Sequence, residues 1–101
     1  MNTYFNKVLD IFKKLKITPK KKILSVGCGT GDLENFLSKE LKINIDCINE
    51  PIYTKKTEKF KFNHHNKNIN YWEANFIDYK FKKYDVLYFQ NSLFIILKIY
   101  E

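Results

Sequence analysis

Apolar residues near the start of the chain recur every three or four positions, with lysines mostly between them. The residues that follow this spacing are Tyr4, Phe5, Val8, Leu9, Phe12 and Leu15. Because this repeat places apolar side chains on one side of a helix, the pattern predicts an amphipathic helix over residues 3–16. We expect the helix to end before Thr18-Pro19, since proline cannot donate the next helical hydrogen bond and disfavours helical geometry in the preceding residue.

A short apolar run at residues 23–26 stops at the sequence GCGTG, residues 27–31, which contains all three glycines of the chain. Asp32 and Glu34 follow, and negative charge is favourable at the start of a helix. An apolar stripe continues beyond them at Leu33, Phe36, Leu37 and Leu41. The pattern therefore predicts a strand, a glycine loop and a helix in direct succession.

The remainder of the chain predicts more strands and helices in alternation. Strands are predicted over residues 43–48, 69–73 and 84–89, a helix over 52–60, and a polar loop over 63–70. The apolar residues 92–100 fit either a helix or a strand, and we favour a helix because it continues the alternation. Such alternation is typical of α/β proteins, in which helices pack on a mostly parallel sheet. We predict a Rossmann-like, doubly wound fold of about four strands. Residues 1–101 are expected to form a single domain, with an N-terminal helix in residues 1–18 and a core in residues 20–95.

The composition is that of a folded protein and limits the classes of function. Hydrophobic residues make up 45% and charged residues 29% of the 101 residues, which is ordinary for a globular domain. The net charge is +7, and all 18 basic residues are lysine. Arginine is the side chain best suited to recognise phosphate or guanine with two hydrogen bonds. Its absence counts against a sequence-specific DNA-binding protein and leaves general nucleic-acid binding as an alternative.

The sequence does not predict a membrane segment. Its longest unbroken apolar stretch, residues 93–97, is far shorter than the roughly 20 residues needed to cross a bilayer. The first 16 residues lack the apolar block and small residues of a secretory signal. We therefore expect a cytoplasmic protein without membrane association.

Two cysteines and two adjacent histidines are the remaining candidates for chemistry. Cys28 and Cys47 do not form a zinc-binding spacing with His64 and His65, so we predict no metal site. The thiols are expected to be reduced and to fill small apolar spaces. The histidines lie in an asparagine-rich stretch and are expected to be solvated, without a functional role.

The glycine loop is the strongest candidate for a binding site. Without Cβ atoms, the backbone of such a loop turns sharply and lets a ligand approach closely. Ligands of doubly wound sheets bind beyond the carboxyl ends of the strands, where residues 27–31, Glu50 and residues 89–92 are expected. Glu50 lies 19 residues after Gly31, a position from which a carboxylate can accept hydrogen bonds from both ribose hydroxyls. An adenosine-containing ligand is therefore favoured. NAD and FAD are less favoured, because the third glycine comes one residue earlier than in the dinucleotide motif.

The segments ILSVGCGTGDLE and YDVLYFQNSL, with Glu50 between them, resemble the class I S-adenosylmethionine-dependent methyltransferases. The resemblance covers about residues 20–95, and VGCGTG is its most specific part. It implies that the loop lies under the methionine part of the cofactor. The loop residues concerned are Gly27, Cys28, Gly29 and Gly31. The family often has an acidic residue at the position of Ser25.

The same resemblance assigns roles to four residues at the ends of later strands. Glu50 would bind the ribose hydroxyls. Asn75 matches a position whose side chain usually meets the adenine amino group, and Phe76 would lie beside the adenine ring. Gln90 would stand near the methyl donor.

The resemblance implies a methyltransferase that transfers a methyl group in line from S-adenosylmethionine to an acceptor, expected to be a small molecule. No residue is identified as catalytic. The chain is short for the family, so we expect a truncated fold that lacks the later strands. The alternative is a non-catalytic or partner-dependent cofactor-binding or interaction module. In that case a second copy or a partner chain would cover the apolar residues 93–100.

Overall fold

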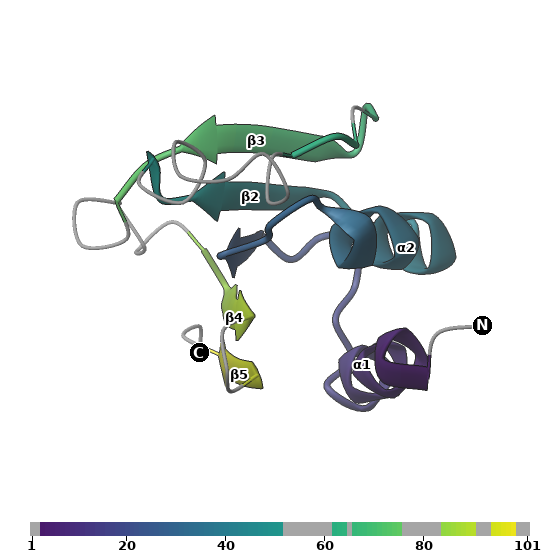
Figure 1. The fold of residues 1–101 in the computed structure, drawn as a ribbon. Coiled ribbons are helices and arrows are strands. Elements are labelled where there is room, and N and C mark those ends of the chain that lie inside the picture. The colour runs from purple at the N-terminus through teal and green to yellow at the C-terminus, as the bar shows by residue number, and fades with distance from the viewer. Residues whose placement is uncertain (1–2, 52–61, 65, 76–83, 91–93, 99–101) are drawn as a thin grey trace.

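The computed structural model describes residues 3–51, 62–64, 66–75, 84–90 and 94–98 (Figure 1). The elements are α1 (Thr3–Lys14), β1 (Ile23–Val26), α2 (Asp32–Leu41), β2 (Ile45–Asn49), β3 (Ile69–Glu73), β4 (Val86–Gln90) and β5 (Phe94–Lys98). The predicted amphipathic helix, the glycine-loop unit and the second, third and fourth strands are confirmed, with their bounds shifted by at most a few residues. The helix predicted over residues 52–60 lies outside the described residues.

The strands form one five-stranded sheet with the order β3-β2-β1-β4-β5. The first four strands along the chain run parallel to one another, and β5 runs antiparallel to β4. The register places Val26 of β1 beside Ile48 of β2 and Phe89 of β4. The carboxyl ends of the four parallel strands therefore lie along the same edge of the sheet.

The prediction of a helix over residues 92–100 is wrong, because the structure has strand β5 there. The run Phe94-Ile95-Ile96-Leu97 is continuously apolar, and such a short run does not distinguish a buried helix from a strand. Aromatic and β-branched residues favour a strand. Pairing with β4, in which Gln90 lies opposite Phe94, also satisfies backbone groups that would otherwise form an open edge of β4.

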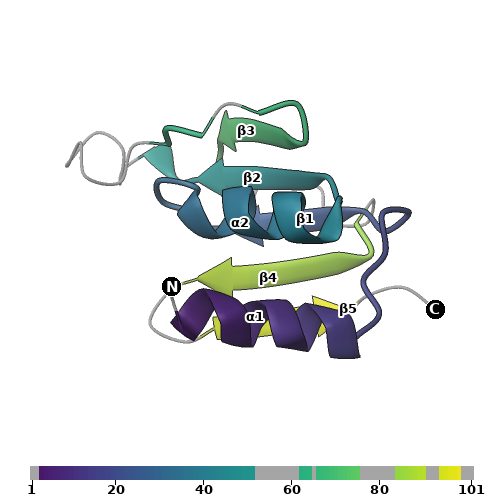
Figure 2. The same cartoon turned by 90° about the vertical axis from the view of Figure 1, so that its right-hand side faces the viewer.

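Both described helices pack on the same face of the sheet (Figure 2). The core on that face includes Phe12 of α1, Leu37 of α2 and Tyr88 of β4, each fully buried. The rings of Phe12 and Tyr88 meet edge to face, with centroids 5.4 Å apart. A second, smaller apolar cluster lies on the other face, around Leu24 and Ile48. Strand β1 is thus buried on both faces, which explains its unbroken burial.

Within the described part of the chain, neither helix has the length and apolar character required to cross a membrane.

Candidate functional site

The predicted cofactor-binding residues that the structure describes lie at or shortly after the carboxyl ends of the four parallel strands. The glycine loop follows β1, Glu50 directly follows β2, and Asn75 lies two residues after β3. Gln90 is the last residue of β4. Phe76 lies outside the described residues. The sheet therefore brings the glycine loop, Glu50, Asn75 and the backbone of Gln90 to one edge. Glu50 is half-buried and Asn75 is exposed.

The glycine loop has a conformation that depends on all three of its glycines. Gly27, Gly29 and Gly31 have φ angles of +76°, +60° and +89°, in the left-handed region that side chains with a Cβ rarely adopt. A Cβ on Gly31 would also lie 2.3 Å from Cε1 of Phe62, whereas a Cβ on Gly29 would meet no atom within 4 Å. Gly31 is thus required by both backbone and packing, while Gly29 is required by backbone alone.

The peptide N–H groups of this loop donate hydrogen bonds within the chain. Those of Gly27 and Cys28 donate to the carbonyl oxygen of Ile48, at 2.8 and 3.4 Å. That of Gly31 donates to the carbonyl oxygen of Cys28 at 3.1 Å. A loop that cradles phosphate presents its N–H groups to the ligand. In this loop, the N–H groups of Gly27, Cys28 and Gly31 instead donate to carbonyl oxygens of the chain itself.

The Asn49 side chain holds the peptide groups of Gly29 in a two-bond pair, a feature that the sequence interpretation missed. Its Oδ1 accepts from the Gly29 N–H and its Nδ2 donates to the Gly29 carbonyl, both at 2.8 Å. Only 4% of Asn49 is exposed. The sequence contains a feature that could have predicted this role. Asn49 alternates with Ile45 and Cys47 along the strand, so its side chain lies on the same buried face, where a polar group needs a hydrogen-bond partner.

An aromatic pair lies against this arrangement. The Tyr71 hydroxyl accepts a hydrogen bond of 3.3 Å from Nδ2 of Asn49. The Tyr71 ring stacks on Phe62 with a centroid separation of 4.4 Å and an interplanar angle of 8°. Burial raises the pKa of the Tyr71 hydroxyl, so the group remains protonated at neutral pH. A continuous series of contacts therefore runs from Gly29 through Asn49, Tyr71 and Phe62 to Gly31.

The segment that contains Phe62 also contacts the start of α2. The Asn63 N–H donates to the Thr30 carbonyl at 3.1 Å. Nε2 of His64 forms a hydrogen bond with Oδ1 of Asp32, the first residue of α2. His64 was predicted to be a solvated residue; it is partly exposed, yet it helps to attach this segment to the helix. His65 lies outside the described residues.

A buried carboxylate lies below the loop, between the sheet and α2. Oε2 of Glu34 accepts hydrogen bonds from the hydroxyls of Ser25, at 2.7 Å, and Tyr88, at 2.6 Å. All three residues are fully buried. Burial, together with the charge of Glu34, raises the pKa of Tyr88 well above its ordinary value. An acidic group from α2 thus lies beside Ser25, the position at which the methyltransferase family often has an acid.

The two cysteines are free thiols and are buried. Burial, followed by contact with the Cys28 thiol, raises the pKa of Cys47 well above its ordinary value. A thiol is nucleophilic only as thiolate, so Cys47 is suited to packing and not to catalysis. No group of three or more His, Cys, Asp or Glu residues able to hold a metal ion occurs among the residues that the structure describes.

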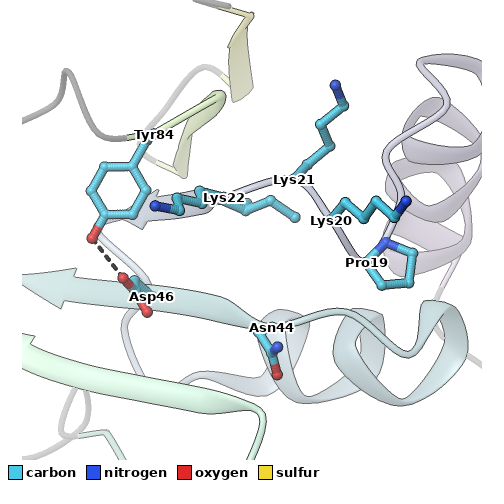
Figure 3. Close-up of a pocket in the computed structure, with 8 residues that line it drawn as sticks. Pro19, Lys20, Lys21, Lys22, Asn44, Asp46 and Tyr84 are labelled. Carbon is cyan, nitrogen blue, oxygen red and sulfur yellow. Dashed lines mark hydrogen bonds between the residues drawn. The ribbon is translucent and has the colours of Figure 1, made fainter.

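A pocket of about 390 Å³ opens at the opposite edge of the sheet, near the amino ends of the strands (Figure 3). Its lining residues are Pro19, Lys20, Lys21, Lys22, Ile23, Asn44, Asp46 and Tyr84. Oδ2 of Asp46 accepts a hydrogen bond of 2.6 Å from the Tyr84 hydroxyl, and the Lys21 side chain points away from that pair. The Lys22 side chain, in contrast, extends toward the pair (Figure 3).

Comparison with known proteins supports the fold. No protein-family model matches the chain, and no curated protein matches it in sequence. A crystal structure that matches is that of a protein from Galdieria sulphuraria described as a candidate sarcosine dimethylglycine methyltransferase, with a TM-score of 0.55 and 22% sequence identity. The fold is methyltransferase-like. The match covers 88% of this chain and 34% of that protein, so the chain spans about a third of its length. The predicted Rossmann-like α/β fold with a mostly parallel sheet is thereby confirmed.

Proposed function

We propose that the chain binds S-adenosylmethionine at the carboxyl edge of its sheet and serves in methyl transfer. The observation that carries this proposal is the combination of a left-handed glycine loop after β1 with a carboxylate, Glu50, directly after the neighbouring strand β2. The methyltransferase-like fold supports the same ligand.

The expected contacts follow the order of the strands. The loop from Gly27 to Gly31 would lie under the methionine part of the cofactor, where the absence of Cβ atoms allows a close approach. Glu50 would accept hydrogen bonds from the ribose hydroxyls. Asn75 would meet the adenine amino group, and Gln90 would stand near the methyl donor.

The loop's own hydrogen bonds favour this ligand over a nucleoside phosphate. The N–H groups of Gly27, Cys28, Gly29 and Gly31 all donate within the chain. The first turn of α2 also carries two acidic residues, Asp32 and Glu34, which oppose an anion at that helix start. S-adenosylmethionine has no phosphate, and its sulfonium carries a positive charge. The site therefore fits this cofactor better than NAD or FAD.

The bound cofactor would supply an activated methyl group, which leaves two tasks to the protein. It must hold donor and acceptor in line, and it must keep water away from the reacting centre. A small-molecule acceptor is the simplest expectation, and some acceptors need no general base. We assign no catalytic residue.

The proposal is tested by isothermal titration calorimetry of the purified chain with S-adenosylmethionine and S-adenosylhomocysteine. Binding in the micromolar range is expected for the wild type. Glu50→Gln keeps the size of the side chain and removes the charge that accepts from the ribose, so it should weaken binding about tenfold or more. Glu73→Gln is the matched control, because Glu73 ends the neighbouring strand β3 and is exposed. It should leave the affinity within about twofold of the wild-type value.

Two results would contradict the proposal. One is the absence of heat from a wild-type protein whose folding is shown by circular dichroism. The other is an equal loss of affinity in the two variants, which would mean that net charge, and not the position of Glu50, determines binding. If binding is established, incubation with labelled cofactor and a panel of small-molecule amines and carboxylates would then identify the acceptor.

A partner-dependent module is the second candidate. It is favoured by Trp72 on the edge strand β3, which is 43% exposed although it is a large apolar residue. This candidate predicts a self-associated or partner-bound chain without methyl transfer. A monomer on size-exclusion chromatography that turns over an acceptor would exclude it.

A further inference from the structure

We infer that Asn49 is the positioning residue of the cofactor site, because it fixes the Gly29 peptides and links the glycine loop to the strand that carries Glu50. The inference rests on the proposed function where it concerns ligand affinity. Its effect on the loop can be measured without a ligand.

The geometry supports this role because Asn49 pairs with the loop as a backbone segment would. A side-chain amide has one donor and one acceptor in the same spacing as a peptide group, and both are used on Gly29 at 2.8 Å. The thiol of Cys28 lies 3.7 Å from the same Oδ1. These contacts set the orientation of the amide, since exchanging Oδ1 and Nδ2 would place like groups against each other.

The location of Asn49 makes it a link between separate parts of the site. It is the last residue of β2 and immediately precedes Glu50. Its carbonyl oxygen accepts from the Ala74 N–H at 3.0 Å, directly before Asn75. Its side chain reaches the loop after β1 and the Tyr71 hydroxyl in β3. Asn49 thus lies at the end of β2 and contacts the segments that follow β1 and β3, at which further cofactor contacts are predicted.

Among the described residues, Asn49 makes the shortest side-chain hydrogen bonds to Gly29, and the Cys28 thiol lies 3.9 Å from the Gly29 carbonyl oxygen. Because a Cβ at this position would meet no atom within 4 Å, packing does not restrain Gly29. The conformation at φ +60° is one that a free glycine adopts in exchange with several others. The two hydrogen bonds from Asn49 therefore select it.

The first measurement is amide hydrogen exchange of the ligand-free chain, followed by NMR. In Asn49→Ala, the protection of the Gly29 amide should fall about tenfold or more, while that of Val26 in the central strand should stay at its wild-type value. A residue that only contributed to global stability would lower both to a similar extent. Tyr71→Phe is the matched control, because it removes the contact to Asn49 and leaves the Gly29 pair in place; it should leave Gly29 protected.

Asn49→Asp gives a second test and does not depend on the alanine variant folding. The protonated aspartic acid can donate to the Gly29 carbonyl and accept from its N–H, whereas the ionised form places an oxygen against that carbonyl. Protection of Gly29, corrected for the intrinsic exchange rate, should therefore be close to wild type at low pH and fall as the introduced carboxyl ionises. The wild type should show no such fall.

Calorimetry with S-adenosylhomocysteine then connects the loop to the ligand. The whole inference is supported if Asn49→Ala loses affinity by about tenfold and also loses exchange protection at the Gly29 amide but not at Val26. If the Gly29 amide of Asn49→Ala alone loses exchange protection but the wild type binds no S-adenosylhomocysteine, the proposed function fails while Asn49 still positions the loop. Unchanged protection of Gly29, or an equal fall at Gly29 and Val26, would overturn the inference whatever the affinity.

Discussion

The hydroxyl of Tyr88 joins β4 to α2 through a buried hydrogen bond, and its removal should destabilise the protein measurably. It donates to Oε2 of Glu34 at 2.6 Å, in a position with no exposure to solvent. Tyr88→Phe deletes one oxygen and keeps the ring, which meets Phe12 edge to face. The substitution therefore tests the hydrogen bond with little change in packing.

The magnitude follows from the charge and burial of the acceptor. A hydrogen bond to a charged group contributes about 1.5–3 kcal/mol, more than a bond between neutral groups. The removed hydroxyl leaves too small a space for a large cavity term. We expect the free energy of unfolding to fall by about 2 kcal/mol at pH 7, and the midpoint of thermal unfolding to fall by roughly 4–8 °C for each kcal/mol.

The assay is urea unfolding followed by circular dichroism at several pH values. The folded-state pKa of Tyr88 is raised, so its stabilising contribution is complete below the unfolded pKa near 10 and decreases above it. Above pH 10 the wild type should lose up to about 1.4 kcal/mol per pH unit relative to Tyr88→Phe. The difference between the two proteins should therefore narrow in alkali.

A matched substitution separates this contact from a general effect of losing a tyrosine hydroxyl. Tyr84 is also buried and donates to Asp46 at 2.6 Å, but this bond is only partly buried. Tyr84→Phe should cost less than half as much as Tyr88→Phe. A loss at Tyr88 below about 0.5 kcal/mol, or equal losses at both positions, would refute the reasoning.

Three further predictions concern stability and use the same unfolding assay. Gly31→Ala should lower the free energy of unfolding more than Gly29→Ala. Both positions have positive φ, which costs an alanine about 1–2 kcal/mol, but only at Gly31 would the new Cβ clash with Phe62. Equal losses of stability would contradict the packing. The free energy of unfolding of the wild type should fall between about pH 9 and 10, because burial raises the native-state pKa of Cys47 and the stabilising contribution of the protonated thiol is lost as the pH rises above its unfolded pKa. Cys47→Ala should reduce this fall. An unchanged slope of the free energy of unfolding against pH would contradict the reasoning. Lys42→Gly should stabilise the protein by about 0.5–1 kcal/mol, because this residue follows α2 with φ +56°; a destabilised variant would show that its side chain matters more than its backbone.

Sequence patterns correctly predicted the parts of the fold in which the burial and conformation of each residue depend on residues close to it in the sequence. The apolar spacing gave α1 and α2, and the glycines clustered after an apolar run located the loop at residues 27–31. Strand β5 was missed because a continuous apolar run contains no period, and only its pairing with β4 distinguishes a strand from a helix.

The site was predictable in outline and not in its supporting contacts. Glu50 and the glycine loop were placed at one edge because parallel strands end together, which follows from topology alone. The pairing of Asn49 with Gly29 and the contact of Ser25 with Glu34 join residues far apart in sequence or in different elements. No local pattern encodes such pairs, although the alternation of β2 showed that Asn49 would be buried.

The order of the sheet also has a consequence for how the chain is made. β1 lies at the centre, and its two neighbours are β2, which follows it closely, and β4, which is synthesised much later. As the chain leaves the ribosome, one edge of β1 can therefore pair early with β2. The other edge stays unpaired until β4 has been synthesised, because its partner residues begin at Val86, which pairs with Ile23. Contacts this distant in sequence slow folding, and an unpaired apolar edge invites aggregation during the delay. β4 and β5, in contrast, are adjacent in sequence and antiparallel, so they can associate with each other rapidly and dock onto β1 as a unit.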